Sequence, residues 1–516
     1  PMNEHLTDWS WCFGYKLYVD FGDGSGVGDL AHAVSGELIG YLEDSNIIYV
    51  RHSDIHGVEG FDVEVYFFAP MHDDYKNSFL IVVLFRNDSG SDRTFYAGLS
   101  NPNSFLRASV RYSTSLNAVV SKNDAGKSWI VGSPDQIDSA YIDGGWRSSD
   151  YVAEDPNEYR VRWRFTLENG KTKVWTILNV FGWSEDEATQ LYNTLRSLNG
   201  KELLEENVDY WRRWLNEGRN FTLGWYELDQ LSRILLCLLK GSITPYHAMP
   251  AGIAAYCDSE WPVDTFTAYW AFALWGHLKE AKDYFAIRIK KLVEYVQNNN
   301  GRLYRDLHIA NLYDYSCGSG YSGDEYFELP IVAAEVYRLC RDREYARSVW
   351  TWIKPIMDDM DAHLIEDGEY AGCFNWNHMN DSAMYEGWLL GGPNAKHGSV
   401  CINTAGLLEI AQVYDGAALI AEAVGEHGYA SDYRGKAKQM RDKVRSLLWN
   451  PSSRQYWRWW SDAEGYVMDV GDNNYEFIRC VPGVADYVDE RIRDSLLLYH
   501  MNLSLIHISE PTRLGM

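Results

Sequence analysis

The chain changes its periodicity once, at Ser184, and this change divides it into two structurally different parts. Before Ser184 it contains short β-branched and aromatic runs with partial alternation, for example residues 62–68 and 79–85. Turn residues such as Asn169-Gly170 separate these runs. Many short strands at this spacing predict an antiparallel β-sandwich. Ser184 is followed by three acidic residues, which is the pattern of a helix start.

After Ser184 helix follows helix, and long connections separate alternate helices. Helices are expected at about 184–198, 201–217, 224–241, 264–277, 279–298, 325–341, 343–364, 400–424, 430–448 and 486–500. The long connections are residues 242–263, 299–324, 365–399 and 449–485. Connections of this length are usually functional in compact domains. Helix pairs with long connections at one end predict an α/α toroid, with its functional site at the mouth that carries the connections.

Both ends of the chain carry unusual residues. Pro1 precedes Met2, so either upstream sequence is missing or Met2 is the true start. Residues 504–513 resemble the in-frame translation of a sequencing adapter, which occurs at the ends of metagenomic reading frames. We therefore expect the natural protein to continue beyond residue 502 and the helical domain to be truncated at its C-terminus.

Charge and composition exclude several classes of partner. The 73 Asp and Glu residues outnumber the 47 Lys and Arg residues, and a net charge of −26 disfavours binding to nucleic acid. No apolar run is long enough for a membrane span, and no nucleotide, flavin or zinc signature is present, so no membrane partner, cofactor or metal is expected. His52 and His56 are expected to form a surface pair. Eight cysteines without a Cys-x-x-Cys pair predict free, mostly buried thiols and a cytoplasmic location.

Aromatic residues give the first positive indication of a ligand. The chain has 21 Trp and 36 Tyr, and aromatics make up 15% of it. A flat aromatic face with a polar edge suits a sugar ring, although tryptophan and tyrosine also fill large protein cores. The excess favours a carbohydrate-binding cleft.

Three connecting segments combine aromatic residues with carboxylates. The first, residues 258–265, contains Trp261 beside Asp264, and Asp264 is also placed where it could cap a helix. The second, residues 319–326, contains Asp324, which could likewise be a helix cap. The third, residues 375–388, is the densest, and core packing does not account for its composition. Its candidate functional residues are Trp376, His378, Asp381, Tyr385, Glu386 and Trp388.

These segments, in this order, resemble glycoside hydrolase family 15, the glucoamylases and their glucodextranase-like relatives, within the six-hairpin glycosidases. Residues 208–215 are similar to the family's Tyr-Trp-Arg-x-Trp-Leu linker between a β-sandwich and an (α/α)6 barrel. Residues 261–265 are similar to its Trp-Pro-Arg-Asp segment, which grips the terminal glucose, with Val263 in place of the arginine. Residues 340–344 are similar to the helix end Thr-Gly-Asp-Arg-Glu. The resemblance covers nearly all of residues 10–500.

The resemblance implies a fold and a domain layout. The expected fold class is α+β with two domains, an N-terminal antiparallel β-sandwich (supersandwich) and an (α/α)6 toroid. The expected parts are a sandwich at 1–183, a helical linker at 184–218, an incomplete barrel at 219–502 and an adapter-derived tail at 503–516. Sugar-binding roles are implied for Trp261, Asp264, Asp324, Trp376, His378, Tyr385 and Trp388.

Two residues compete for the role of the catalytic acid. Met384-Tyr385-Glu386-Gly387 falls where family 15 has Leu-Trp-Glu-Glu, which makes Glu386 the general acid. Debranching-enzyme and family 63 relatives instead carry an aspartate in a Trp-Met-Asp segment, which would make Asp381 the acid. An inverting enzyme also needs a second carboxylate, roughly 6.5–9.5 Å away, to activate water. No residue is assigned to that role, because the family's base lies in a later segment.

The sequence therefore predicts an inverting, exo-acting glycoside hydrolase that cleaves α-glucosidic bonds of maltodextrin, isomalto-oligosaccharide or trehalose. An alternative is a polysaccharide lyase on a similar toroid, in which Asn375, His378, Tyr385 and His397 would abstract a proton beside a uronate carboxylate. A second alternative is a catalytically inactive sugar-binding fragment. The oligomeric state is not predicted.

Overall fold

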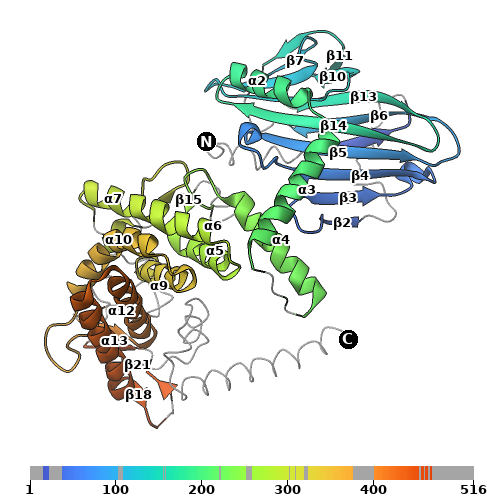
Figure 1. Ribbon diagram of the computed structural model, residues 1–516. Helices are drawn as coiled ribbons and strands as arrows, with labels where there is room; N and C mark the ends of the chain where they lie inside the picture. The colour runs from blue at the N-terminus through green and yellow to red at the C-terminus, as the bar shows by residue number, and fades with distance from the viewer. Residues whose placement is uncertain are drawn as a thin grey trace. The chain divides into compact units, whose positions relative to one another are not determined.

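The chain divides into two compact units, residues 1–242 and residues 243–516. The computed structural model describes residues 16–22, 38–102, 108–154, 156, 158–219, 222, 224–250, 259–301, 303–307, 310–318, 323–375, 400–452, 455–457, 459–462 and 465–467. Figure 1 shows that the first unit is mainly strands and the second mainly helices. The mixed α+β class predicted from the change at Ser184 is confirmed.

Nine antiparallel strands form the larger sheet of the first unit. In sheet order they are β12 (Tyr151–Ala153), β7 (Ala108–Ser113), β8 (Ala118–Asn123), β9 (Ser128–Gly132), β14 (Lys171–Gly182), β5 (Ser78–Asn87), β4 (Phe61–Phe68), β3 (Ile48–His52) and β2 (Leu38–Tyr41). The runs predicted at 62–68 and 79–85 are β4 and β5, which pair with each other. Short 3-10 turns, η3 (Ile55–Gly57) and η4 (Asp73–Tyr75), lie beside β4.

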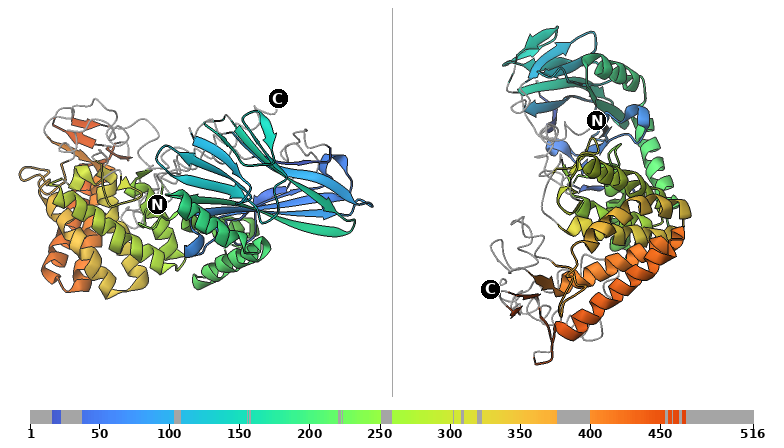
Figure 2. Two further views of the ribbon diagram at one scale, coloured as in Figure 1. Left: turned by 90° about the horizontal axis from the view of Figure 1, so that it is seen from above. Right: turned by 90° about the vertical axis from the view of Figure 1, so that its left-hand side faces the viewer.

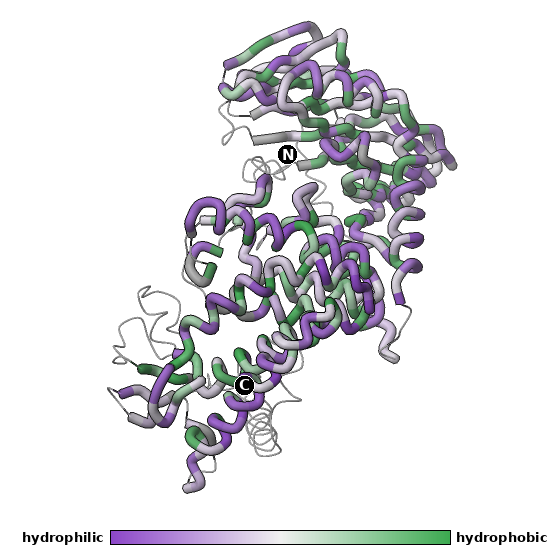
Figure 3. The backbone as a smooth tube through the Cα atoms, turned by 60° about the vertical axis from the view of Figure 1, so that its left-hand side comes forward, coloured by the Kyte–Doolittle hydropathy of each residue, from purple (hydrophilic) through white to green (hydrophobic). Residues whose placement is uncertain are grey.

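A second, five-stranded antiparallel sheet packs against the first. Its order is β1 (Lys16–Asp20), β6 (Arg93–Pro102), β13 (Glu158–Leu167), β10 (Ser139–Ile142) and β11 (Gly145–Arg147). One apolar core joins the two sheets, and at its centre the rings of Trp163 and Trp175 lie 4.9 Å apart. Hydrophobic and hydrophilic residues alternate along the strands (Figure 3) because successive side chains point to opposite faces. The unit is therefore a two-layer sandwich.

Two helices cover the other face of the nine-stranded sheet. They are α2 (Glu185–Arg196) and α3 (Gly200–Glu217), close to the helices predicted there (Figures 1 and 2). The Ser184 hydroxyl accepts from the Glu187 N–H at 3.3 Å, so this residue caps α2 as its sequence pattern indicates. Tyr192 and Leu195 of α2 join a second apolar core with Leu80 and Val82 of β5. The central strands are thus buried on both faces.

The last helix of this unit, α4 (Tyr226–Ser242), rests on the turn between β2 and β3. Arg233 Nε lies 2.5 Å from Asp44 Oδ1, and Cys237 is buried beneath it. The opposite face exposes Trp225, Leu231 and Leu235. In the sandwich, His52 is buried, so the expected surface pair with His56 is wrong for His52.

The second unit is built from three consecutive helical hairpins within its described ranges. The first joins α5 (Pro262–Leu274) to α6 (Leu278–Asp283), the π-helical turn η5 (Tyr284–Ile289) and α7 (Lys290–Asn298). The second joins α9 (Gly323–Cys340) to α10 (Arg343–Asp361), and the third joins α12 (Thr404–Val424) to α13 (His427–Leu447). Figure 2 shows α12 and α13 as antiparallel neighbours. The single helix predicted at 279–298 is interrupted by the π-helical turn. The helix predicted at 486–500 lies outside the described residues.

In each hairpin the first helix is largely buried within the unit, and the second helix has one face exposed to solvent. The first helices, α5, α9 and α12, pack in a row, with α9 between the other two. They are apolar around most of their circumference, whereas α7, α10 and α13 have one apolar and one polar face. Turns of only a few residues close each hairpin at one end. This is the repeating unit that a toroid requires, and closure of the ring stays a prediction.

Short strands and the α8 turn complete the described part of this unit. They are α8 (Leu303–Asp306), β15 (Ser259–Glu260) paired with β16 (Ala310–Asn311), β17 (Cys401–Asn403) with β20 (Trp459–Ser461) and β21 (Gly465–Val467), and β18 (Trp449–Asn450) with β19 (Gln455–Tyr456). Among the described cysteines, Cys237, Cys373 and Cys401 are buried, and Cys317 and Cys340 are partly exposed. Within the described ranges, no helix is both long enough and apolar enough to cross a membrane.

Candidate active site

The predicted site residues fall into two groups. Trp376, His378, Asp381, Tyr385, Glu386 and Trp388 lie in segment 376–399, outside the described residues, as does His397 of the lyase alternative. Asp264 and Asp324 lie in the first turns of α5 and α9. The N-cap of α5 is Trp261, with Pro262 at the first helical position, so the capping role weighed for Asp264 is wrong.

Each of the three predicted segments is followed in the chain by the first helix of a hairpin. Segment 258–265 leads into α5, segment 319–326 leads into α9, and segment 375–388 precedes α12. A Cβ added to Gly416, twelve residues into α12, would lie 3.1 Å from the Pro330 carbonyl oxygen and 3.2 Å from Ala334 Cβ of α9. Pro330 and Ala334 lie seven and eleven residues into α9, so the middle of α12 packs closely against the middle of α9.

The two ends of segment 376–399 meet at a fixed point. Asn375 is buried, and its Oδ1 accepts from the backbone N–H of Cys401 at 3.1 Å. Its own N–H donates to the His363 carbonyl at 3.0 Å. On the return side, the N–H of Val400 donates to Asp462 Oδ1 at 3.2 Å. The chain therefore leaves and re-enters at neighbouring backbone positions.

An aromatic cluster stands beside this point. The rings of Tyr370 and Trp460 lie 4.1 Å apart, and those of Trp457 and Tyr466 lie 5.4 Å apart. The hydroxyls of Tyr370 and Tyr466 are 3.0 Å from each other. Burial raises the pKa of the nearby Cys373 thiol to about 11, so this cysteine is not a thiolate nucleophile at neutral pH.

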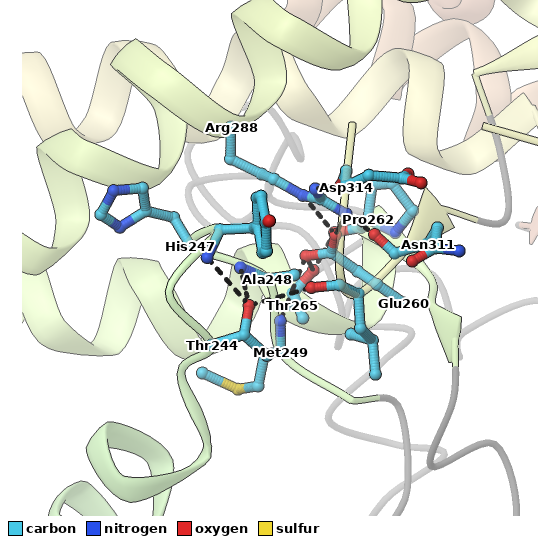
Figure 4. Close-up of polar contacts among 12 residues, drawn as sticks. Thr244, His247, Ala248, Met249, Glu260, Pro262, Thr265, Arg288, Asn311 and Asp314 are labelled. Atoms are coloured by element: carbon cyan, nitrogen blue, oxygen red, sulfur yellow. Dashed lines mark hydrogen bonds and ion pairs between the residues drawn. The ribbon is translucent and has the colours of Figure 1, made fainter. Parts of the chain in front are cut away.

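A buried ion pair organises the segment around Trp261 (Figure 4). Glu260 and Arg288 are both fully buried, and Arg288 Nη2 lies 2.6 Å from Glu260 Oε2. The Arg288 Nε–H also donates to Oε2, at 2.7 Å. The Thr265 hydroxyl donates to Oε1 at 3.2 Å. Burial raises the pKa of Glu260, while Arg288 opposes that rise.

The guanidinium of Arg288 reaches a second segment of chain. Its Nη2 donates to the Asn311 carbonyl at 2.6 Å, and its Nη1 donates to the Asp314 carbonyl. The ring of Tyr315 lies 5.6 Å from the Arg288 Cζ. Arg288 therefore joins β15, β16 and the turn after β16 from its position in the π-helical turn.

Glu260 extends the same network to residues 244–249. The Met249 N–H donates to Glu260 Oε1 at 3.4 Å. Thr244 holds a tight turn, because its hydroxyl accepts from the N–H of Ala248 at 3.2 Å. Within that turn His247 has a φ of 58°, a left-handed conformation that is costly for a residue with a side chain.

Two tyrosines pack behind the pair. The Thr265 hydroxyl lies 2.8 Å from the Tyr284 hydroxyl, and the rings of Tyr284 and Tyr269 stack at 4.0 Å. The Tyr269 hydroxyl donates to the His247 carbonyl at 3.2 Å. Burial raises the pKa of both tyrosines, so they act as neutral hydrogen-bonding groups.

Sequence reasoning did not assign a role to Glu260 or Arg288. The available signal was Arg288 itself, because its neighbours Ile287 and Ile289 place a charge in an apolar stretch of helix. A buried arginine requires a partner carboxylate. Among the described residues, no group of His, Cys, Asp and Glu is arranged to hold a metal ion.

Comparisons with known proteins identify the fold. No family model matches the chain, and no curated protein matches it. A bacterial glucoamylase solved in complex with acarbose is similar over 84% of this chain, with a TM-score of 0.57 and 16% identity. A protein proposed to be a kojibiose phosphorylase, from the human microbiome, is similar over 87% of this chain, with a TM-score of 0.56 and 12% identity. The matched regions span 62% and 61% of those two chains. The chain therefore shares the fold of the matched regions of these two structures.

Proposed function

We propose that this protein is a carbohydrate-active enzyme of the glycoside hydrolase type that cleaves α-glucosidic bonds in gluco-oligosaccharides. The observation that supports the proposal is the position of three segments along the chain, relative to the helical hairpins. The fold is similar to that of a glucoamylase, and the three segments in which the sequence concentrates aromatic residues and carboxylates each precede or open the first helix of a hairpin, which supports a shared site for them. The substrate class follows from the neighbours' names and from the excess of tryptophan and tyrosine.

The proposed reaction is an inverting, exo-acting hydrolysis. A protonated carboxyl group gives its proton to the leaving glycosidic oxygen, while water attacks the opposite face of the sugar. We assign the proton donor to Glu386 and keep Asp381 as the alternative donor. An apolar, tryptophan-rich wall around the acid, which is part of this proposal, would favour its protonated form because such a wall disfavours the charged carboxylate. Trp261, Asp264, Asp324, Trp376, His378, Tyr385 and Trp388 are the proposed sugar-binding residues.

Phosphorolysis is the second candidate reaction. The likeness to the proposed kojibiose phosphorylase is as strong as that to the glucoamylase, with TM-scores of 0.56 and 0.57. In phosphorolysis an inorganic phosphate anion replaces water as the nucleophile, and the sugar is released as a glycosyl phosphate. The general acid does the same work in both reactions.

The first prediction concerns the acid. Glu386→Gln keeps the size of the side chain but cannot donate a proton, so kcat on an unactivated α-glucoside should fall by about 10²–10⁴. The measurement is glucose release from maltotriose, kojibiose and trehalose, with and without phosphate, and with the anomer identified by proton NMR. Asp381→Asn is the matched control. Near-normal activity of Glu386→Gln together with loss in Asp381→Asn would move the acid to Asp381.

The phosphate dependence separates the two reactions. Turnover that needs phosphate and yields a glucosyl phosphate would establish phosphorolysis. Release of free β-glucose without phosphate would establish inverting hydrolysis. An unsaturated product that absorbs in the ultraviolet, formed from a uronate polymer, would refute both and favour a lyase.

A further inference from the structure

The stability of the fold does not by itself explain why Glu260 and Arg288 form a buried ion pair. Both side chains have no exposed surface, and replacing a buried ion pair by apolar residues of similar volume is often neutral or stabilising. The pair lies beside two other local irregularities, the π-helical turn Tyr284–Ile289 and the left-handed His247. Such turns and such backbone conformations are frequent at functional sites. The ion pair, the π-helical turn that contains Arg288 and the left-handed His247 therefore lie in one place.

The contacts of the pair show what it holds. Glu260 belongs to the strand that enters α5, and it accepts a hydrogen bond from Met249 in segment 244–250. Arg288 donates to the carbonyls of Asn311 and Asp314, which lie in segment 310–317. These three segments carry the partly exposed aromatic residues Tyr246, Trp261 and Tyr315, and the third segment also carries Tyr313, whose hydroxyl is buried. The pair thus sets the relative positions of three aromatic side chains on separate segments.

Local geometry determines how these aromatic residues are presented. The backbone is extended through Glu260 and Trp261, where φ is −99° and ψ is 116°. Successive side chains on extended backbone point in opposite directions, so the burial of Glu260 turns Trp261 away from the pair. The rings of Tyr246 and Tyr315 meet edge to face, with centroids 5.6 Å apart.

We propose that Arg288 is a positioning residue for a sugar-binding rim made of Tyr246, Trp261 and Tyr315. This inference rests on the proposed function and adds Tyr246 and Tyr315 to the residues that contact a gluco-oligosaccharide. Arg288 acts through its planar guanidinium group, which binds the Glu260 carboxylate and the carbonyl oxygens of Asn311 and Asp314 at the same time. A lysine would keep the charge but could not span the same acceptors.

The experiment compares Arg288→Lys with Arg441→Lys in the full chain. Arg441 is a suitable control because its Nη1 forms an ion pair with Asp415 Oδ2 at 2.5 Å in the same unit, but the pair joins α13 to α12. Hydrogen exchange without any ligand is the first measurement. Arg288→Lys should raise exchange at the amides of 244–250 and 310–317 by at least about tenfold, and Arg441→Lys should not. Unchanged exchange in these segments would overturn the positioning role, whatever the enzyme does.

Steady-state kinetics on maltotriose is the second measurement. Arg288→Lys, Tyr246→Ala and Tyr315→Ala should each raise KM by about tenfold while kcat stays within about twofold, because the rim binds sugar without taking part in bond cleavage. Tyr429→Ala, an exposed tyrosine of α13, should leave KM unchanged. An unchanged KM in the two rim variants, with wild-type turnover intact, would overturn the rim alone. A wild-type chain that neither binds nor cleaves any α-glucoside would refute the proposed function and the rim together.

Discussion

Arg341 has a strained backbone conformation in the turn between α9 and α10. It lies between α9 and α10 with a φ of 54°, a left-handed conformation, and its N–H donates to the Tyr337 carbonyl at 2.8 Å. The resembled family has glycine at this point of its Thr-Gly-Asp-Arg-Glu segment. Glycine adopts this conformation without the clash that a Cβ causes.

Arg341→Gly should therefore raise the free energy of unfolding by about 0.5–1 kcal/mol, since the relief of strain exceeds the added freedom of the unfolded chain. Urea denaturation followed by far-ultraviolet circular dichroism measures the change. Arg341→Ala is the control, because alanine keeps the Cβ and should show no such gain. Equal stabilisation by both variants would mean that the arginine side chain, and not the backbone, carries the cost.

Individual residues also show which contacts can be predicted from the sequence and which cannot. The cap at Ser184 is predictable because it depends on Glu187, three residues away. The pair of Glu260 and Arg288 joins residues that are 28 positions apart, so no local pattern reports it. Trp261 and the carboxylates beside it are visible in the sequence, whereas the contact between Glu260 and Arg288 has no local sign.

At the scale of elements, α10 depends on Asp342. The Asp342 carboxylate accepts from the N–H groups of Glu344 and Tyr345, at 2.9 and 3.2 Å, and lies 2.9 Å from Lys282 Nζ. The hydrogen bond from Lys282 and those from the two backbone N–H groups lower the pKa of Asp342. A folded-state pKa below the unfolded value means that this stabilisation is present above about pH 4 and is lost as the pH falls through the folded value.

Asp342→Ala should lower the free energy of unfolding at pH 7 by about 1 kcal/mol, because the start of α10 loses its cap. Asp342→Asn keeps an oxygen for the cap but cannot ionise. The difference in melting temperature between the wild type and Asp342→Asn should thus be constant from pH 5 to 8 and shrink below about pH 4. A difference that stays constant down to pH 3 would show that the charge contributes nothing.

The contact between α9 and α12 leads to a prediction about packing. Gly416 permits the two helices to approach closely, whereas Gly435 on the exposed face of α13 has no neighbour within 4 Å of an added Cβ. Gly416→Val should lower stability by about 1–3 kcal/mol through overpacking. Gly435→Ala should raise stability by about 0.5–1 kcal/mol through helix propensity. Thermal unfolding of both variants tests these two predictions. Similar effects of the two changes would contradict the close approach of α9 and α12 at Gly416.

At the scale of the whole molecule, the sequence predicts the architecture better than the site. The change at Ser184 separates strands from helices, and the helical hairpins follow from apolar periodicity, because each such pattern is contained within one element. The π-helical turn escapes prediction because Arg288, which it carries, makes its contacts with segments more than 20 residues away. The order of strands in the two sheets also depends on long-range pairing, such as that of Lys16 with Ser100, for which the sequence holds no local sign.

The hydrogen bond between Asn375 and Cys401, which flank residues 376–399, leads to a prediction about replacing this segment. When the two ends of a segment are held together by the scaffold, its length contributes only a slowly growing loop-closure entropy. Replacing it with a short Gly-Ser linker should therefore leave the melting temperature within a few degrees of the wild type while abolishing catalysis, as calorimetry and sugar-release assays would show. Loss of cooperative unfolding would mean that the segment belongs to the core. If the scaffold tolerates the exchange, segments of other sequence and length could be installed between the same two residues, and specificity could change while the hairpins stay as they are.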